Sequence, residues 1–169
     1  MNLSIYWSNL NISLILIFNY LYYYYGTIEY HNISTAILFM YLFFDTLMMI
    51  YTKKPFQLYG AYMAHHVIGM ISVVISSIYH LEFLFSQYIN FEISTLFLNY
   101  YYIKKDVASR LLFFISFTIV RIIYGTLLLV KVMSINSNLA IIVIPFHIIN
   151  YYWYYGMIKK FYEYLASTS

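Results

Sequence analysis

Six apolar runs divide the sequence, and each is close to the length of a membrane-crossing helix. A helix needs about 20 apolar residues to cross the ~30 Å of hydrocarbon in a bilayer. Hydrophobic residues make up 63% of the chain and charged residues only 9%, which is too apolar for a water-soluble domain. We therefore predict an all-α, polytopic transmembrane bundle with about six membrane-spanning helices. The runs are Ile5 to Tyr25, Ile33 to Tyr51, Phe56 to Tyr79, Phe83 to Ile103, Leu111 to Val130 and Leu139 to Ile158.

The connections between the runs are short and leave no room for a separate soluble domain. Residues 1–169 are expected to form one transmembrane domain, with any chemistry inside the bundle. The first run is interpreted as a true span, because no Lys or Arg precedes it and no small-residue cleavage site follows it. The sequence contains no cysteine, which excludes disulfides and thiolate metal sites.

Basic residues indicate how such a bundle is oriented. On a path of six spans, most of them fall on the side that holds the N-terminus, and only Lys131 falls opposite. The positive-inside rule then predicts that both termini are cytosolic. A formal net charge of +3 requires no nucleic-acid partner, because lysines beside helix ends meet anionic lipid headgroups. The residues on the N-terminal side are Lys53, Lys54, Lys104, Lys105, Arg110, Lys159 and Lys160.

Ionisable side chains interrupt five of the apolar runs. A charge at the centre of a membrane helix costs roughly 3 kcal/mol if it is left unpaired. These side chains are therefore expected to turn inward, find partners and form a central polar cavity. They are Asp45, His65, His66, Glu92, Arg121 and His147.

Depth and helical phase suggest how these groups pair. Glu92 and Arg121 lie near the middle of their runs and form the expected ion pair, which leaves Asp45 or Asn150 to accept a hydrogen bond from an imidazole. Spacings of three and four residues place Glu92 and Asn99 on one helix face. The same spacing places His147 and Asn150 on one face of the last run.

The adjacent pair His65 and His66 suggests chemistry. Neighbours on a helix point about 100° apart, so one packed partner cannot satisfy both, and one of them is expected to face the cavity. A histidine there can act as a general base or acyl acceptor, with Asp45 as a carboxylate that fixes its tautomer. A metal site is not expected from one histidine pair. A serine hydrolase is poorly supported because no Gly-x-Ser-x-Gly motif is present.

Several fragments resemble a known family of membrane proteins. They are WSNLNIS, YLFFDTLMMIY, AHHVIGM, FEISTLFLN, FTIVRIIYG and NYYW, in this order along the chain. Together they resemble the TLC domain, which the TRAM, Lag1 and CLN8 proteins share. The most specific fragment, FEISTLFLN, is similar to the Glu-Leu-Ser-Thr-x-Phe-Leu-Asn signature of the small TLC domain-containing proteins.

The resemblance implies a multi-pass protein of the endoplasmic reticulum or another endomembrane, concerned with lipid. The Tyr- and Ile-rich composition is typical of an AT-rich genome such as that of a protist or a large DNA virus, and a viral protein would lie in a host membrane. Ceramide synthases carry a pair of aspartates after the histidines, whereas no aspartate occurs here between His66 and Asp106. The chain is thus closer to the small TLC proteins than to true ceramide synthases.

Three functions are compatible with these observations. The first is lipid binding, lipid sensing or control of membrane lipid composition, without a cofactor. The second is a ceramide synthase-like N-acyltransferase that uses His65 or His66, with acyl-CoA as the co-substrate. The third is a transporter or proton relay, which is disfavoured because no paired Gly or Pro residues predict broken helices. The residues expected to contact a lipid are Glu92, Asn99, Arg121, His147 and Asn150.

Overall fold

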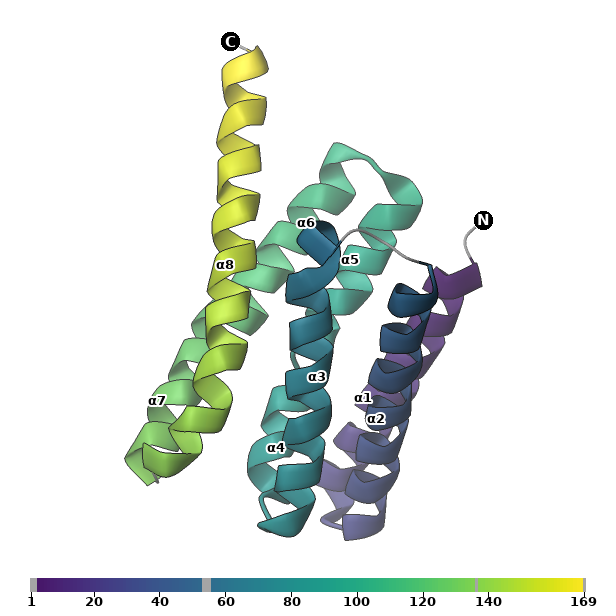
Figure 1. The fold of residues 1–169 in the computed structure, drawn as a ribbon, viewed down its shortest axis with the longest axis vertical. Coiled ribbons are helices and arrows are strands. Elements are labelled where there is room, and N and C mark those ends of the chain that lie inside the picture. The colour runs from purple at the N-terminus through teal and green to yellow at the C-terminus, as the bar shows by residue number, and fades with distance from the viewer. Residues whose placement is uncertain (1–2, 53–55, 136, 169) are drawn as a thin grey trace.

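The computed structural model describes residues 3–52, 56–135 and 137–168, and all regular structure in these ranges is helical (Figure 1). The predicted all-α class is therefore confirmed. By length and composition, three helical segments can cross a membrane: Ile28–Tyr51, Gly60–Ile78 and Val107–Ile135. The elements are α1 (Leu3–Tyr25), α2 (Ile28–Tyr51), α3 (Phe56–Ile78), α4 (Glu82–Ile89), α5 (Glu92–Lys104), α6 (Val107–Phe117), η1 (Thr118–Tyr124), α7 (Gly125–Ile135) and α8 (Ser137–Thr168).

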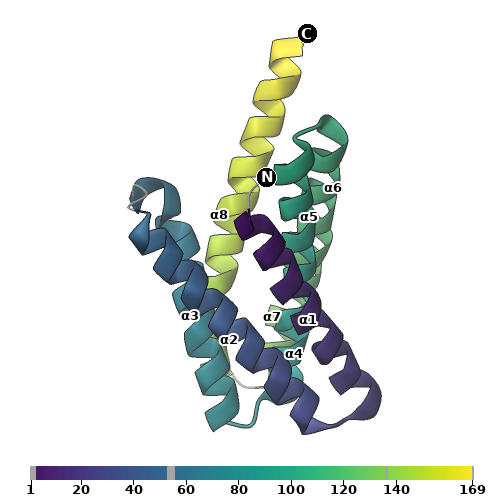
Figure 2. The same ribbon diagram turned by 90° about the vertical axis from the view of Figure 1, so that its right-hand side faces the viewer.

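The helices lie side by side and run up and down the long axis of the molecule (Figures 1 and 2). α1 and α2, α2 and α3, α5 and α6, and α7 and α8 pack as antiparallel neighbours, and α1 also packs against α5 while α3 packs against α8. α6, η1 and α7 follow one another as one continuous helical segment. Both ends of the chain lie at the same end of the bundle, and α8 extends beyond the other helices there (Figure 1). An even number of passes places the two chain ends in this way.

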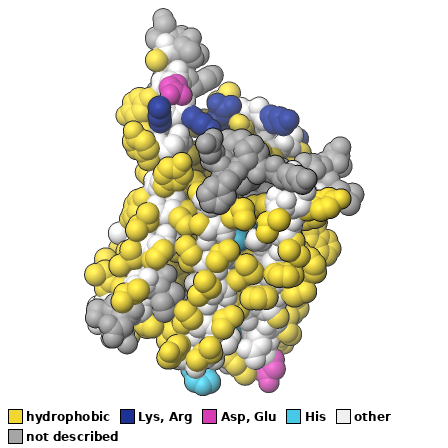
Figure 3. Space-filling view, in the orientation of Figure 1, with side chains coloured by type: hydrophobic (Ala, Val, Ile, Leu, Met, Phe, Trp, Pro, Cys, Tyr) yellow, Lys and Arg dark blue, Asp and Glu magenta, His cyan; other side chains and the backbone are white. Residues whose placement is uncertain are grey.

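Most of the exposed basic side chains lie near one end of the bundle. Figure 3 shows basic side chains in a band near the end where the chain termini lie, and a flank covered by hydrophobic side chains below it. Such a flank fits contact with hydrocarbon. Lys53 and Lys54 lie outside the described residues. The exposed basic residues at the α5–α6 turn and on α8 are Lys104, Lys105, Arg110, Lys159 and Lys160.

A tight turn joins α1 to α2. Gly26 has a φ of +68°, and its N–H donates to the Tyr22 carbonyl over 2.8 Å, which closes the end of α1. The two helices approach closely enough for the buried Ser34 hydroxyl to donate to the Ile15 carbonyl over 2.9 Å. The hairpin thus forms one wall of the core.

The predicted fourth span is broken into α4 and α5 at Asn90 and Phe91. The buried Asn19 side chain of α1 donates to the Ser86 carbonyl at 3.0 Å and to Asn90 Oδ1 at 3.2 Å, so it satisfies groups that the break exposes. The sequence predicted one continuous run from Phe83 to Ile103, and the structure has two helices there instead. The stabilising donor comes from a distant helix and not from a local Gly or Pro.

The Asn19→Ala variant should weaken this interruption. Removal of the amide leaves the buried Ser86 carbonyl without a donor, so we expect the free energy of unfolding to fall by about 1–3 kcal/mol. Chemical denaturation in mild detergent measures the change. The matched control is Asn11→Ala on the same helix, because in the described part of the chain Asn11 bonds only to the Trp7 carbonyl one turn away. Equal stability of the two variants would contradict this role for Asn19.

Candidate functional site

Arg121 occupies the centre of η1, a seven-residue π-helix inserted between α6 and α7. π-Helical turns are rare and often occur at functional sites. Only 4% of Arg121 is exposed, so its guanidinium lies inside the bundle. A buried guanidinium must direct its donors at acceptors within the protein.

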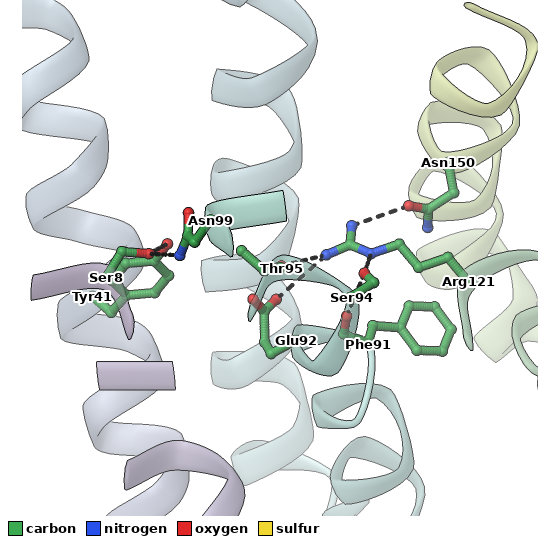
Figure 4. Close-up of polar contacts among 9 residues, drawn as sticks. All are labelled: Ser8, Tyr41, Phe91, Glu92, Ser94, Thr95, Asn99, Arg121 and Asn150. Carbon is green, nitrogen blue, oxygen red and sulfur yellow. Dashed lines mark hydrogen bonds and ion pairs between the residues drawn. The ribbon is translucent and has the colours of Figure 1, made fainter. Parts of the chain in front are cut away.

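Hydrogen bonds from Arg121 reach two other helices (Figure 4). Its Nε donates to Ser94 Oγ at 2.7 Å, and its Nη2 donates to Thr95 Oγ1 at 2.9 Å, both on α5. Its Nη1 donates to Asn150 Oδ1 of α8 at 3.2 Å. The Phe117 ring lies 5.4 Å from the guanidinium carbon and adds a cation–π contact. The arginine therefore joins η1, α5 and α8.

Glu92 completes this cluster at a longer distance. Its Oε1 lies 3.9 Å from Arg121 Nη2, so the expected ion pair is present but is longer than the three hydrogen bonds. The carboxylate lies in the first turn of α5, where the helix dipole favours negative charge. Neutral oxygen atoms make the shortest contacts with the guanidinium, and Glu92 supplies the balancing charge.

His147 lies one helical turn before Asn150 on α8, close to Gly125. The fully buried imidazole has Nε2 3.4 Å from the Tyr88 hydroxyl, and its Nδ1 has no hydrogen-bond partner among the described residues. A Cβ atom at Gly125 would lie 3.0 Å from the Phe91 ring and 3.1 Å from His147 Cε1. The glycine therefore allows α7 to approach these two rings.

Asn99 belongs to a second polar cluster. Its Nδ2 donates to Ser8 Oγ at 3.0 Å and to Asn9 Oδ1 at 2.8 Å, and Ser8 Oγ lies 3.0 Å from the Tyr41 hydroxyl. Figure 4 shows Asn99 beside Ser8 and Tyr41, while Arg121 lies beside Ser94 and Asn150. This second cluster connects α1, α2 and α5, and it is separate from the arginine cluster.

His66 turns toward α2. Its Nδ1 lies 3.4 Å from Thr46 Oγ1 and 3.6 Å from Asp45 Oδ2. The Asp45 side chain is 41% exposed, whereas that of His66 is 7% exposed. Asp45 is therefore the carboxylate beside an imidazole, and the Asn150 oxygen accepts from Arg121 instead.

His65 turns toward α8 and lines a cavity. Its ring lies 4.7 Å from the Phe146 ring and 5.2 Å from the Trp153 ring, measured between centroids. Its Nδ1 is buried and has no hydrogen-bond partner in the described part of the chain. The two adjacent histidines thus have different surroundings, as their angular separation on the helix predicts.

The cavity lies between α2, α3, α4 and α8 and has a volume of about 80 Å³. Leucine, isoleucine, valine and phenylalanine side chains form most of its wall. This wall is more apolar than the sequence analysis expected, because most buried polar groups bond to one another outside it. The polar side chains that line it are His65, Ser72, Ser76, Tyr88 and Glu92.

Sequence reasoning missed several residues that make the site's contacts. Ser94 makes the shortest bond to Arg121, and Ser8 and Asn9 bond to Asn99. The signal for Ser94 was present, since it lies inside the FEISTLFLN fragment. Ser76 lies with His65, Gly69 and Ser72 in a stripe of small and polar residues, which the sequence alone indicates as close helix packing, and Tyr88 gave no signal.

Comparison with known proteins identifies the family. A bundle of apolar helices with polar side chains gathered inside it belongs to the class of helical integral membrane proteins. The chain is 36% identical over 138 residues to a TLC domain-containing protein of Acanthamoeba polyphaga mimivirus, an alignment that covers 71% of this chain and 68% of that protein. The chain therefore belongs to the TLC domain family. No family model and no solved structure matches it.

Loss of the central guanidinium should destabilise the bundle. Arg121→Ala leaves Glu92 buried without its cation and three oxygen acceptors without donors, so we expect a loss of about 3–5 kcal/mol in the free energy of unfolding. Denaturation in mild detergent measures it. The control is Arg110→Ala at the exposed α5–α6 turn, which should change stability by no more than about 0.5 kcal/mol. Comparable losses in both variants would contradict the assignment.

Proposed function

We propose that this protein crosses an endomembrane six times and binds a membrane lipid in the cavity between α2, α3, α4 and α8. Through this binding it senses or adjusts membrane lipid composition. Membership of the TLC family and the apolar outer flank support the membrane part of the proposal. The positive-inside rule supports a cytosolic location for both termini, because the exposed basic residues lie at their end of the bundle. The endoplasmic reticulum is the membrane we favour.

The observation that carries the lipid proposal is the cavity itself. Hydrophobic side chains cover most of its wall, and a few polar groups converge on it, as is usual for sites that bind small amphiphilic molecules. Glu92 and Tyr88 line the cavity from the α4–α5 side, and His65 faces it from α3. These groups can hold the polar end of a lipid while the apolar wall holds a chain.

The remaining residues of the arginine cluster lie outside the cavity and hold its wall in place. The donors of Arg121 point to Ser94, Thr95 and Asn150, so the guanidinium fixes the position of α5 and of Glu92. Neither Arg121 nor Asn150 lines the cavity. We therefore assign direct lipid contact to Glu92 and a positioning role to Arg121 and Asn150.

An N-acyltransferase is the second candidate, and the unpartnered Nδ1 of His65 is the observation in its favour. An imidazole with a free nitrogen beside a lipid cavity can take a proton from an attacking amine. The carboxylate that would orient a catalytic imidazole lies beside His66 and not beside His65. Binding without turnover therefore remains the primary proposal.

Mass spectrometry of the purified protein tests lipid binding. We expect protein purified in mild detergent to retain lipid, and Val143→Trp, which fills the cavity from α8, to lose it. The matched control is Ile144→Trp, because Ile144 is the next residue on α8 and is exposed. Absence of lipid from the wild type, or equal retention by both variants, would refute the proposal.

A parallel assay with acyl-CoA and sphinganine separates binding from catalysis. We expect no N-acylated product from the wild type. Product that disappears in the His65→Ala, His66→Ala double variant but persists in His80→Ala would establish the acyltransferase instead. His80 is a suitable control because its side chain is 86% exposed at the opposite end of α3.

A further inference from the structure

Ser76 is a buried polar residue that the proposed function does not use. It is 3% exposed, it lines the cavity, and its Oγ has no hydrogen-bond partner among the described residues. A buried hydroxyl without a partner destabilises the folded state, so it requires an explanation. Serine has one polar side-chain atom, and in Ser76 that atom is buried and has no partner among the described residues.

Other buried polar atoms without partners have a different context. Asn19, His147 and Asn150 each have one such atom, but each bonds or contacts a neighbour through its other side-chain polar atom. These side chains already hold helices together. His31 also has one such atom, and it does not line the cavity. Ser76 and His65 differ from these side chains, because both of them line the cavity.

The positions of His65 and Ser76 on α3 define a distance. They are separated by eleven residues, which is close to three helical turns, so both lie on one face of α3. At 1.5 Å per residue the separation is roughly 16 Å, the length of an extended chain of about twelve carbons. The wall between them includes Gly69 and Ser72, and the Ser72 hydroxyl already donates to the Ile68 carbonyl at 2.8 Å.

Residues outside α3 can also be assigned to the His65 end or to the Ser76 end of the cavity. Phe146 accompanies His65 at one end, because the Phe146 ring stacks on the imidazole. Leu81 and Leu139 accompany Ser76 at the other end: the Leu81 N–H donates to the Ser76 carbonyl at 2.9 Å, and Leu139 lies near the start of α8. The cavity is therefore elongated along α3, with an unpartnered polar atom near each end.

We propose that the cavity selects a single-chain amphiphile with hydrogen-bonding groups at both ends, about 16 Å apart, which bond to His65 and to Ser76. This inference rests on the proposed lipid-binding function and deepens it by naming the class of ligand. The narrow volume suits one chain, and Glu92 on the wall of the cavity disfavours an anionic ligand. A hydroxyl at each end of the chain satisfies both protein atoms.

Binding of two matched probes tests the inference. Dodecane-α,ω-diol and dodecanol have the same chain and differ only in the second hydroxyl. In equilibrium dialysis against delipidated protein in detergent, we expect the wild type to bind the diol about tenfold more tightly than the alcohol. Hexane-α,ω-diol is too short to span the two sites and should show no such gain.

Variants of two serines on the same wall provide the control. Ser76→Ala should bind the diol and the alcohol equally, whereas Ser72→Ala should keep the preference because the Ser72 hydroxyl is satisfied by its own helix. Without ligand, Ser76→Ala should unfold at the same temperature as the wild type or higher, since it removes an unbonded polar group. This measurement also establishes that the variant folds.

Three outcomes would overturn the inference. Equal binding of diol and alcohol by the wild type would mean that Ser76 bonds to water and not to the ligand. The proposed lipid binding would not be contradicted by that result. A preference that persists in Ser76→Ala would place the second contact elsewhere. Failure of both twelve-carbon probes to bind, together with absence of copurified lipid, would refute the proposed function as well.

Discussion

The burial of one guanidinium determines how three helices of this protein meet. A charged side chain inside a membrane helix is costly, so Arg121 must have acceptors at the correct depth. Ser94 and Thr95 supply these acceptors, because α5 begins at Glu92, just after the break that separates α4 from α5. That break is held by Asn19 from α1. The position of the arginine cluster thus depends on a hydrogen bond made by the first helix of the chain.

The sequence predicted the helices well because the bilayer leaves few alternatives. Without water to bond to the backbone, an apolar run of about 20 residues must be helical, and in the described residues the runs fall on helices except at the break in the fourth run. The depth of Glu92 and Arg121 likewise predicted their pairing. The break at Asn90 and the π-helix around Arg121 could not be predicted, because tertiary hydrogen bonds stabilise them and no local signal marks them.

Helical phase was an incomplete guide to the site. Glu92, Thr95 and Asn99 share one face of α5, yet Thr95 bonds to Arg121 while Asn99 bonds to Ser8 and Asn9. The reason is that α5 packs against both α1 and η1, so neighbouring positions on one face meet different helices. A periodic pattern identifies a buried face, but it does not identify the partner of each residue on that face. The single polar chamber expected from the sequence is instead two polar clusters and a mainly apolar cavity.

The distribution of hydrogen bonds separates residues that hold the bundle from residues that are available to a ligand. Arg121, Asn99 and Asn19 each bond to two or more groups on other helices, which is the pattern of a structural contact. His65 and Ser76 line the cavity with polar atoms that the described part of the chain does not satisfy. A purely structural protein would gain stability from an apolar side chain at either position. Burial of an unbonded polar atom at each end of one cavity destabilises the empty protein, and a ligand that bonds to both atoms would offset this loss. A bilayer supplies amphiphilic chains of the required length.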